Sequence, residues 1–328
     1  MNSGILLSKK FVERFDAELS QAESGPGLKT TRIIIDVDND QVISDDVLNE
    51  VGVAFFSNDV RYRRDVFLET LTRAKNLQWL HFFAVGINPK NFPQLMGRDI
   101  SITNSPGANA EPIALNVLAA ILWLGRPFQY WRESQAQHAW NPIHYDDAPP
   151  DIGGQTLLII GLGEIGSRVA RYAKSVGMHV IGIRRNVNDI PEGVDELYHN
   201  SEIDNLLPSA EWLVLACPLN DETEGLITSE RLSKLPKGSR IINVSRGPVI
   251  DEESLTQKLI AGHLGGAYLD VFKEEPLPPS SLLWELPNVI VSPHNSAISD
   301  KYHERSAERF FENLIRWRKG ESLNWIVQ

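Results

Sequence analysis

The chain alternates short apolar runs with amphipathic segments over most of its length. In the first hundred residues the apolar runs, which we expect to form strands, cover residues 5–7, 32–37, 53–56, 77–84 and 100–103. Segments with a helical spacing of apolar positions lie between them, at residues 10–19, 45–51 and 65–74. Strands that alternate with helices at this spacing predict a parallel sheet with helical crossovers.

A second series of alternating elements begins near residue 110. Residues 110–124 are almost wholly apolar and predict a helix that is buried, either in its own domain or under a partner subunit, and residues 131–140 continue it with more polar positions. Further strands are expected at residues 157–160, 179–183, 212–216, 240–244, 266–272 and 289–291. The helices expected among and after them cover residues 167–176, 228–235, 252–261 and 301–319. The whole pattern predicts an α/β protein.

The most informative motif follows the strand expected at residues 157–160. Gly161, Gly163 and Gly166 form G-x-G-x-x-G between that strand and a helix, and a second strand closes the unit. This is the context in which glycines hold a dinucleotide. The first glycine permits a tight turn, the second lets the backbone approach a pyrophosphate, and the third lets helix and strand pack closely. The N-terminus of the helix would direct free N–H groups at the phosphates.

The residues after the second strand of this unit indicate which dinucleotide binds. An NAD site places Asp or Glu there to bind the ribose 2′-hydroxyl. This chain has Arg184 and Arg185, and the nearest acid is Asp189. Guanidinium groups attract a 2′-phosphate that a carboxylate would repel, so we expect NADP(H) to be preferred over NAD(H). The alternative is that both arginines are solvated surface charges.

Composition limits the class of protein. The 328 residues suffice for two domains, and 42% hydrophobic with 23% charged residues is ordinary for a globular chain. No apolar run approaches the roughly 18 residues of a membrane helix, and the N-terminus lacks the features of a signal peptide. A single cysteine, Cys217, suits a reducing compartment, so we expect a cytoplasmic protein. A net charge of −11 argues against general nucleic-acid binding.

Three expected strands in the second half run into polar residues. Arg246, Glu275 and His294 follow the strands at 240–244, 266–272 and 289–291. Ligands of doubly wound sheets lie beyond the carboxyl ends of the strands, where these side chains would meet. Hydride transfer to a 2-oxo acid needs a cation for the carboxylate, a proton donor for the developing alkoxide and a partner for that donor. Each residue alone could be a loop charge, but together they favour this chemistry.

Several segments resemble the D-isomer-specific 2-hydroxyacid dehydrogenases, specifically the NADP-preferring reductases of glyoxylate and hydroxypyruvate. The three signature-like segments are Asn243-Val244-Ser245-Arg246-Gly247, Asp270-Val271-Phe272-Lys273-Glu274-Glu275-Pro276 and Ser292-Pro293-His294. The glycine turn, Cys217-Pro218-Leu219 and Asn104-Ser105-Pro106-Gly107 fit as well. The resemblance runs from about residue 77 to the C-terminus, while residues 1–76 fit the layout without a recognisable motif.

The resemblance implies two doubly wound parallel-sheet domains. A Rossmann cofactor domain, residues 105–296, is inserted into a flavodoxin-like substrate domain made of residues 1–104 and 297–328. Catalysis in such a protein needs closure of the cleft between the domains to exclude water. The apolar helix at 110–124 suggests a homodimer, although a helix buried within one chain gives the same pattern.

The resemblance also implies residue roles. Arg246 binds the substrate carboxylate, His294 is the acid/base with Glu275 as its partner, and the backbone of Val85 and Gly86 holds the carboxylate from the other domain. The implied cofactor-binding residues are Gly161, Leu162, Gly163, Glu164, Ile165, Gly166, Arg184, Arg185, Cys217, Pro218, Thr223, Val244, Ser245, Asp270 and His294. Asp270 would orient the nicotinamide carboxamide. No metal is expected.

The chain departs from the family pattern at three places. Leu115 stands where the long helix often carries a glutamate, Asn88-Pro89 replaces an acid after Gly86, and Arg184 replaces the usual ribose-binding aspartate. The prediction is an NADPH-dependent reductase of a small 2-oxo acid that forms the D-2-hydroxy acid. One alternative is a dinucleotide-sensing protein of the same fold that resembles corepressors. Another is a different Rossmann enzyme, such as a methyltransferase.

Overall fold

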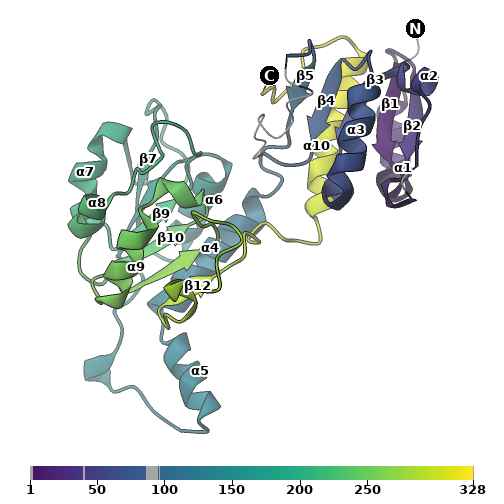
Figure 1. Ribbon diagram of the computed structural model, residues 1–328. Helices are drawn as coiled ribbons and strands as arrows, with labels where there is room; N and C mark the ends of the chain where they lie inside the picture. The colour runs from purple at the N-terminus through teal and green to yellow at the C-terminus, as the bar shows by residue number, and fades with distance from the viewer. Residues whose placement is uncertain (1–2, 40, 86–94, 96, 328) are drawn as a thin grey trace. The chain divides into compact units, whose positions relative to one another are not determined.

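The computed structural model describes residues 3–39, 41–85, 95 and 97–327, and the chain divides into two compact units (Figure 1). Unit 1 comprises Met1–Asn109 and Ser299–Gln328, and unit 2 comprises Ala110–Ile298. The chain therefore enters unit 2 and returns to unit 1, which makes unit 2 an insertion. The sequence predicts the two crossings at 104/105 and 296/297, and the units meet at 109/110 and 298/299.

Unit 1 contains a five-stranded sheet in which all strands are parallel. Its spatial order is β2 (Thr30–Ile35), β1 (Ser3–Ser8), β3 (Val51–Phe56), β4 (Trp79–Phe82) and β5 (Ser101–Thr103). The order 2-1-3-4-5 is the flavodoxin-like one. Its helices are α1 (Lys9–Glu23), α2 (Asp45–Leu48), α3 (Arg64–Arg73) and α10 (Tyr302–Arg318). Every residue of β3 and β4 is buried, as expected for strands covered on both faces.

Unit 2 contains a seven-stranded parallel sheet. Its order is β12 (Val289–Val291), β11 (Gly266–Leu269), β10 (Arg240–Asn243), β9 (Trp212–Leu215), β6 (Thr156–Ile160), β7 (His179–Ile183) and β8 (Glu196–Tyr198). From β6 the chain adds β7 and β8 on one side of the sheet and then returns to add β9 to β12 on the other side. The strand order therefore reverses between β6 and β9, which are parallel neighbours, as in a dinucleotide-binding sheet. Ligands of such sheets bind beyond the carboxyl ends of the strands at this reversal.

Helices cover both faces of the sheet of unit 2. They are α4 (Ala110–Gly125), α6 (Glu164–Ser175), α7 (Ile203–Leu206), α8 (Ser229–Lys234) and α9 (Glu252–Ile260). Helix α5 (Phe128–Ala136) follows α4 and projects away from the sheet (Figure 1). One face has a core that includes Val117 of α4 and Val169 of α6. The other face has a core that includes Leu232 of α8 and Leu255 of α9. These two cores hold the strand ends of unit 2 in fixed register.

Some elements differ from the sequence-based expectation. The helix expected at 45–51 ends at Leu48, because Val51 is fully buried and already belongs to β3. The helix expected at 131–140 is α5, which begins at Phe128 and ends at Ala136. Strand β8 has no counterpart among the expected strands, since Glu196–Tyr198 is short and only partly buried.

Helix α4 is apolar on all sides but buries only one stripe in the chain. Ala114, Val117 and Ile121 are fully buried, whereas Leu115 is 48% exposed. The prediction of an all-round buried helix therefore does not hold within a single subunit. Among the described residues, no helix combines the length and the hydropathy needed to cross a bilayer.

Candidate active site

The glycine turn joins β6 to α6 at the carboxyl edge of the unit 2 sheet. Gly161 has φ +98°, a conformation that favours glycine, and a Cβ there would lie 2.6 Å from the backbone nitrogen of Cys217. A Cβ on Gly166 would collide with the carbonyl oxygen of Gly161. At Gly163, in contrast, a Cβ would meet no atom of the described residues within 4 Å. The first and third glycines are thus required by packing, and the second borders open space.

The N-terminus of α6 fits a pyrophosphate. Gly163 is the N-cap and supplies no side-chain hydrogen bond, so the first N–H groups of the helix are not capped by a side chain. Together with the helix dipole, such groups form an anion-binding site. The carboxylate of Glu164 lies in the first turn, and Arg168 pairs with it at 2.7 Å. This ion pair offsets the negative charge that Glu164 brings to the site.

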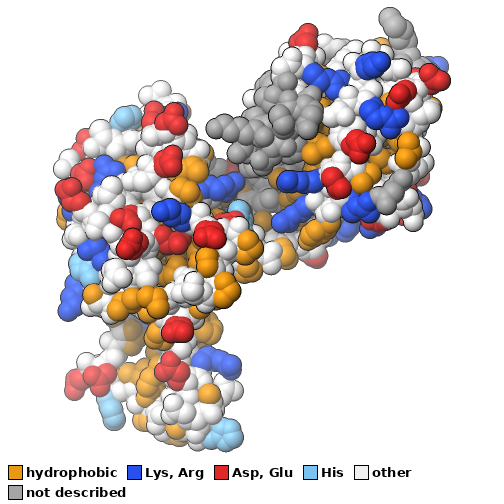
Figure 2. Space-filling model, viewed as in Figure 1, with side chains coloured by type: hydrophobic (Ala, Val, Ile, Leu, Met, Phe, Trp, Pro, Cys, Tyr) orange, Lys and Arg blue, Asp and Glu red, His pale blue; other side chains and the backbone are white. Residues whose placement is uncertain are grey.

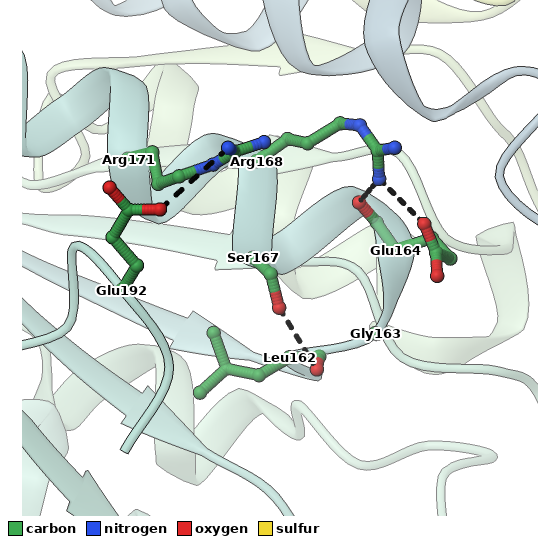
Figure 3. A pocket seen from close by; sticks show the side chains of 7 residues that line it. All are labelled: Leu162, Gly163, Glu164, Ser167, Arg168, Arg171 and Glu192. Atoms are coloured by element: carbon green, nitrogen blue, oxygen red, sulfur yellow. Dashed lines mark hydrogen bonds and ion pairs between the residues drawn. The ribbon is translucent and has the colours of Figure 1, made fainter.

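A cavity of about 520 Å³ opens beside this turn (Figure 3). It is lined by Leu162, Gly163, Glu164, Ser167, Arg168, Arg171 and Glu192. The guanidinium of Arg171 lies 3.8 Å from the carboxylate of Glu192 across the cavity. Leu162 is 7% exposed, and Ile165 packs against the hydrophobic core. These two side chains therefore anchor the glycine turn to the core of unit 2.

The end of β7 carries the arginine pair expected to select the cofactor. Arg184 is half-buried, and its guanidinium donates a hydrogen bond to the carbonyl oxygen of Asp189. Its Nε atom is buried and has no hydrogen-bond partner among the residues that the structure describes. Arg185 is exposed and pairs with Glu222 at 3.1 Å. The strand end therefore carries two guanidinium groups, one half-buried and one exposed.

The loop after β9 forms the opposite wall of the glycine turn, because its backbone at Cys217 touches Gly161. Burial raises the pKa of the Cys217 thiol to about 11. The hydroxyl of Thr223 donates to the carbonyl oxygen of Pro218 at 2.6 Å, and the N–H of Asn220 donates to the same hydroxyl at 2.8 Å. Cys217 and Pro218 thus lie in a turn that Thr223 holds closed.

Arg246 lies in a turn that a buried asparagine fixes. The side-chain oxygen of Asn243 accepts hydrogen bonds from the N–H and the hydroxyl of Ser245, at 3.0 and 2.7 Å. Its side-chain nitrogen donates to the carbonyl oxygen of Arg246 at 3.2 Å. Val244 and Ser245 are buried, whereas Arg246 is half-buried. The sequence analysis did not assign Asn243 a role; the signal was available, because Asn two residues before Ser is typical of an Asx turn.

Glu275 and His294 are in contact. A carboxylate oxygen of Glu275 lies 2.7 Å from Nδ1 of His294, and the other carboxylate oxygen accepts from the N–H of Phe272 at 3.1 Å. With an ionised Glu275, Nδ1 carries the proton of this bond, which leaves Nε2 free for another partner. The backbone of His294 has φ +53°, which is rare for a residue other than glycine. Such strain is typical of functional sites.

Backbone contacts link the arginine turn to the Glu275–His294 pair. Any side chain at Gly247 would collide with the backbone carbonyl of Phe272, so the turn after β10 packs directly on the loop after β11. The backbone N–H of Phe272 donates to the carboxylate of Glu275, and this carboxylate is hydrogen-bonded to the ring of His294. Since β10, β11 and β12 are neighbours in the sheet, all three candidate residues follow adjacent strand ends.

Asp270 holds the loop that carries His294. Its carboxylate, 3% exposed, accepts hydrogen bonds from the hydroxyl of Ser292 at 2.6 Å and from the N–H groups of Asn295 and Ser296 at 2.8 and 2.9 Å. The hydroxyl of Ser296 also donates to it. The expected role of Asp270 toward a nicotinamide stays a prediction. The sequence did not predict that Ser292 and Ser296 bind Asp270, because that pairing depends on strand register.

In unit 1, the residues expected to hold the substrate carboxylate follow β4. Val85 is 49% exposed at the carboxyl end of that strand, and its carbonyl oxygen accepts a hydrogen bond from the side chain of Asn104 at 3.3 Å. Gly86 lies outside the described residues. The exposed Val85 is accessible to a ligand.

Comparison with known proteins agrees with this geometry. Residues 118–296 match the family model of the D-isomer specific 2-hydroxyacid dehydrogenase, NAD binding domain. A glyoxylate reductase of Korarchaeum cryptofilum is 34% identical over 260 residues, which cover 77% of this chain and 76% of that protein.

Two crystal structures resemble the chain over nearly its full length. A D-isomer specific 2-hydroxyacid dehydrogenase family protein of Aeromonas salmonicida has a TM-score of 0.80 and 30% identity, covering 100% of this chain and 99% of the other. A D-isomer specific 2-hydroxyacid dehydrogenase of Xanthobacter autotrophicus, in complex with NADPH and MES, has a TM-score of 0.78 and 29% identity, covering 99% and 98%. The sequence match and the two sheets together establish that this chain belongs to the D-isomer-specific 2-hydroxyacid dehydrogenases, a family of NAD(P)-dependent oxidoreductases.

Proposed function

We propose that the chain reduces a small 2-oxo acid, similar to glyoxylate or hydroxypyruvate, to the D-2-hydroxy acid with NADPH. The observation that carries the proposal is the 2.7 Å contact between Glu275 and His294 beside the turn of Arg246. Besides a hydride source, this reduction requires a cation that binds the substrate carboxylate and a proton donor that is held in position. Arg246 would supply the first and His294, held by Glu275, the second.

Unit 2 would bind the dinucleotide and unit 1 would contribute to the substrate site. The open space over Gly163 and the uncapped N-terminus of α6 would take the pyrophosphate, and the loops of Cys217, Val244 and Asp270 would flank the rest. The nicotinamide cofactor supplies the hydride. The residues of the chain bind, orient and protonate the substrate.

His294 would donate a proton from Nε2 to the developing alkoxide oxygen. Glu275 accepts the hydrogen bond of Nδ1, which fixes the ring orientation and stabilises the protonated imidazole before transfer. In the reverse direction the same nitrogen accepts the hydroxyl proton. The strained backbone at His294 and the hydrogen bonds of its loop to Asp270 support this role, because they hold the ring in one place.

Arg246 would bind the substrate carboxylate and polarise the neighbouring carbonyl. Its planar guanidinium offers two parallel N–H donors, the geometry that a carboxylate accepts. In the described structure one of its terminal nitrogens donates to the carbonyl oxygen of Ser245 at 2.6 Å, which restrains the side chain near the strand end. The backbone of Val85 and Gly86 would hold the same carboxylate from unit 1.

The preference for NADPH would come from the end of β7. Arg184 is half-buried at the strand end, and Arg185 forms an exposed ion pair with Glu222. Both groups are available to a 2′-phosphate, and no carboxylate stands at the usual ribose-binding position. That the similar Xanthobacter protein was crystallised with NADPH supports this preference.

A homodimer would cover the exposed apolar residues near α4 and α5. Leu115, Phe128, Trp131, Trp140 and Tyr145 are between 39% and 99% exposed. Figure 2 shows hydrophobic side chains on the visible surface of this part of unit 2. Light scattering during gel filtration tests the dimer, and a monomer at micromolar concentration would refute it. The single cysteine supports a reducing compartment such as the cytoplasm.

The experiment that tests the reaction is NADPH oxidation with a panel of 2-oxo acids, followed by chiral analysis of the product. We expect turnover of glyoxylate or hydroxypyruvate and a D-configured product from hydroxypyruvate. Tight NADPH binding without turnover of any acid in the panel would refute the proposal and favour a sensing protein of the same fold.

The Arg184→Asp variant tests cofactor selection. We expect kcat/KM for NADPH to fall and that for NADH to rise, because the carboxylate repels the 2′-phosphate and binds the 2′-hydroxyl. Arg64→Asp at the exposed start of α3 (Arg64–Arg73) is the matched control, since it makes the same charge change in the other unit. Unchanged selectivity in the Arg184 variant would show that the end of β7 does not select the cofactor.

A further inference from the structure

Unit 1 buries a histidine in an aromatic environment. His81, on β4, has no exposed surface, and its ring centroid lies 5.5 Å from that of Phe55, 5.8 Å from Phe310 and 6.0 Å from Trp79. Burial lowers the pKa of His81 to about 3, so the imidazole is neutral at physiological pH. A neutral imidazole has one donor and one acceptor, and a core position costs stability unless both are used.

Both nitrogens of His81 are used, and the direction of the hydrogen bonds can be assigned. Trp79 Nε1 can only donate, and it donates to the hydroxyl oxygen of Thr103 at 2.8 Å. At the other end the Ser105 hydroxyl donates its single proton to the carbonyl oxygen of Phe82, so toward His81 it accepts, and the ring proton is on Nε2. Nδ1 of His81 then accepts from the Thr103 hydroxyl at 2.7 Å. Nε2 donates to the hydroxyl of Ser105 at 2.9 Å, and Ser105 donates to the carbonyl oxygen of Phe82 at 3.1 Å. We call this the His81 chain.

The His81 chain ends at the segment that leads to the proposed carboxylate site. Phe82 is the last residue of β4, and residues 83–85 follow it. The neighbour of Ser105, Asn104, donates from its side chain to the carbonyl oxygen of Val85 at 3.3 Å. Two consecutive side chains after β5 therefore hold the two ends of segment 82–85. Apolar residues in place of His81 and Ser105 would fill the core without holding this segment.

We propose that His81 and Ser105 are positioning residues for substrate binding. Neither touches the substrate; His81 fixes the Ser105 hydroxyl, and Ser105 fixes segment 82–85, whose exposed end at Val85 receives the substrate carboxylate. This inference rests on the proposed function for the identity of the ligand. The position of the segment itself does not depend on the reaction.

The experiment compares substitutions at Ser105 and at Thr103, which lie on opposite sides of His81 in the His81 chain. Ser105→Ala removes the contact with Phe82, whereas Thr103→Val removes the contact with Nδ1 and leaves Ser105 in place. Both lose buried hydrogen bonds, so both lower the melting temperature. We expect Ser105→Ala to raise KM for the 2-oxo acid about fivefold to tenfold, the effect of one hydrogen bond, with kcat and KM for NADPH within twofold of wild type. Thr103→Val leaves all three constants within twofold.

Hydrogen exchange of peptides that cover residues 83–85 provides a readout without substrate. We expect faster exchange in Ser105→Ala than in wild type and unchanged exchange in Thr103→Val. Ser105→Thr, which keeps the hydroxyl, restores the wild-type KM and exchange. If Ser105→Ala does not fold, His81→Leu replaces it, because an apolar side chain suits the aromatic environment and still removes the donor to Ser105.

The outcomes separate the inference from the proposed function. Equal effects of the two substitutions on KM, or unchanged exchange at residues 83–85 in Ser105→Ala, would overturn the positioning role. If wild type reduces no 2-oxo acid, the proposed function fails, and faster exchange in Ser105→Ala alone would still support the placement of the segment by the His81 chain.

Discussion

Replacement of His81 by glutamine is expected to remove a pH-dependent part of the stability of unit 1. In the folded protein burial lowers the pKa of this imidazole to about 3, compared with 6.5 for an unperturbed histidine. Between these two values the unfolded chain binds a proton at His81 that the folded chain does not bind. Stability is therefore fully present above about pH 6.5 and is lost as the pH falls toward 3. Glutamine does not titrate and shows no such loss.

The magnitude follows from the gap between the two pKa values. Each pH unit within the gap changes the free energy of unfolding by about 1.4 kcal/mol per proton. At pH 5, about 1.5 units below 6.5, the loss is about 2 kcal/mol. This figure hardly depends on the folded value, provided that it stays below about 4. Solvent does not screen this effect, because His81 has no exposed surface.

Urea unfolding of wild type and His81→Gln at pH 8 and pH 5 tests this value. Because the chain has two units, the unfolded fraction of unit 1 should be read from pulse-labelled peptides of β4. We expect wild type to lose about 2 kcal/mol more than the variant between the two pH values. His303, whose pKa burial also lowers, is present in both proteins and cancels in the difference. Equal losses in the two proteins would show that His81 is protonated in the folded state.

Three substitutions in unit 2 test the candidate site. His294→Ala should lower kcat by about 10²–10⁴-fold in NADPH-dependent turnover, whereas the exposed His199→Ala should not, and near-normal turnover would remove His294 from the mechanism. Arg246→Lys should raise KM for the 2-oxo acid despite the retained charge, because an ammonium group lacks the planar pair of donors; wild-type kinetics would contradict this. Gly166→Ala should lower stability by about 1–3 kcal/mol in urea unfolding and abolish NADPH binding in titrations, since its Cβ meets the carbonyl oxygen of Gly161; tight binding would show that the turn adjusts.

The sequence predicts most of the fold because apolar runs and glycine turns act locally. The parallel strands of both units and the G-x-G-x-x-G turn follow from short-range patterns. Strand β8 was not predicted, because the short segment Glu196–Tyr198 is extended through its pairing with β7, which the local sequence does not show. The end of the helix at Leu48 is set by burial of Val51 in the sheet, which is a tertiary effect.

The residues of the candidate site likewise fall into those that the sequence identifies and those that only the structure identifies. Arg246, Glu275 and His294 have distinctive chemistry, so their positions after three strands suffice to select them. The residues that hold them, such as Asn243 and Ser296, are ordinary polar residues whose partners become neighbours only through strand register. The contact between His81 and Ser105 spans 24 positions and likewise depends on the pairing of β4 with β5.

The backbone contact between Cys217 and Gly161 makes the sole thiol of the chain a reporter of local opening. Cys217 is 7% exposed and the pKa of its thiol is about 11, so on the order of one molecule in a thousand carries the thiolate at pH 8. Reaction with a disulfide reagent therefore requires the loop after β9 to move away from the glycine turn. If the proposed dinucleotide binds against both segments, the labelling rate of wild-type protein would fall with occupancy of unit 2 and would report it with no engineered probe.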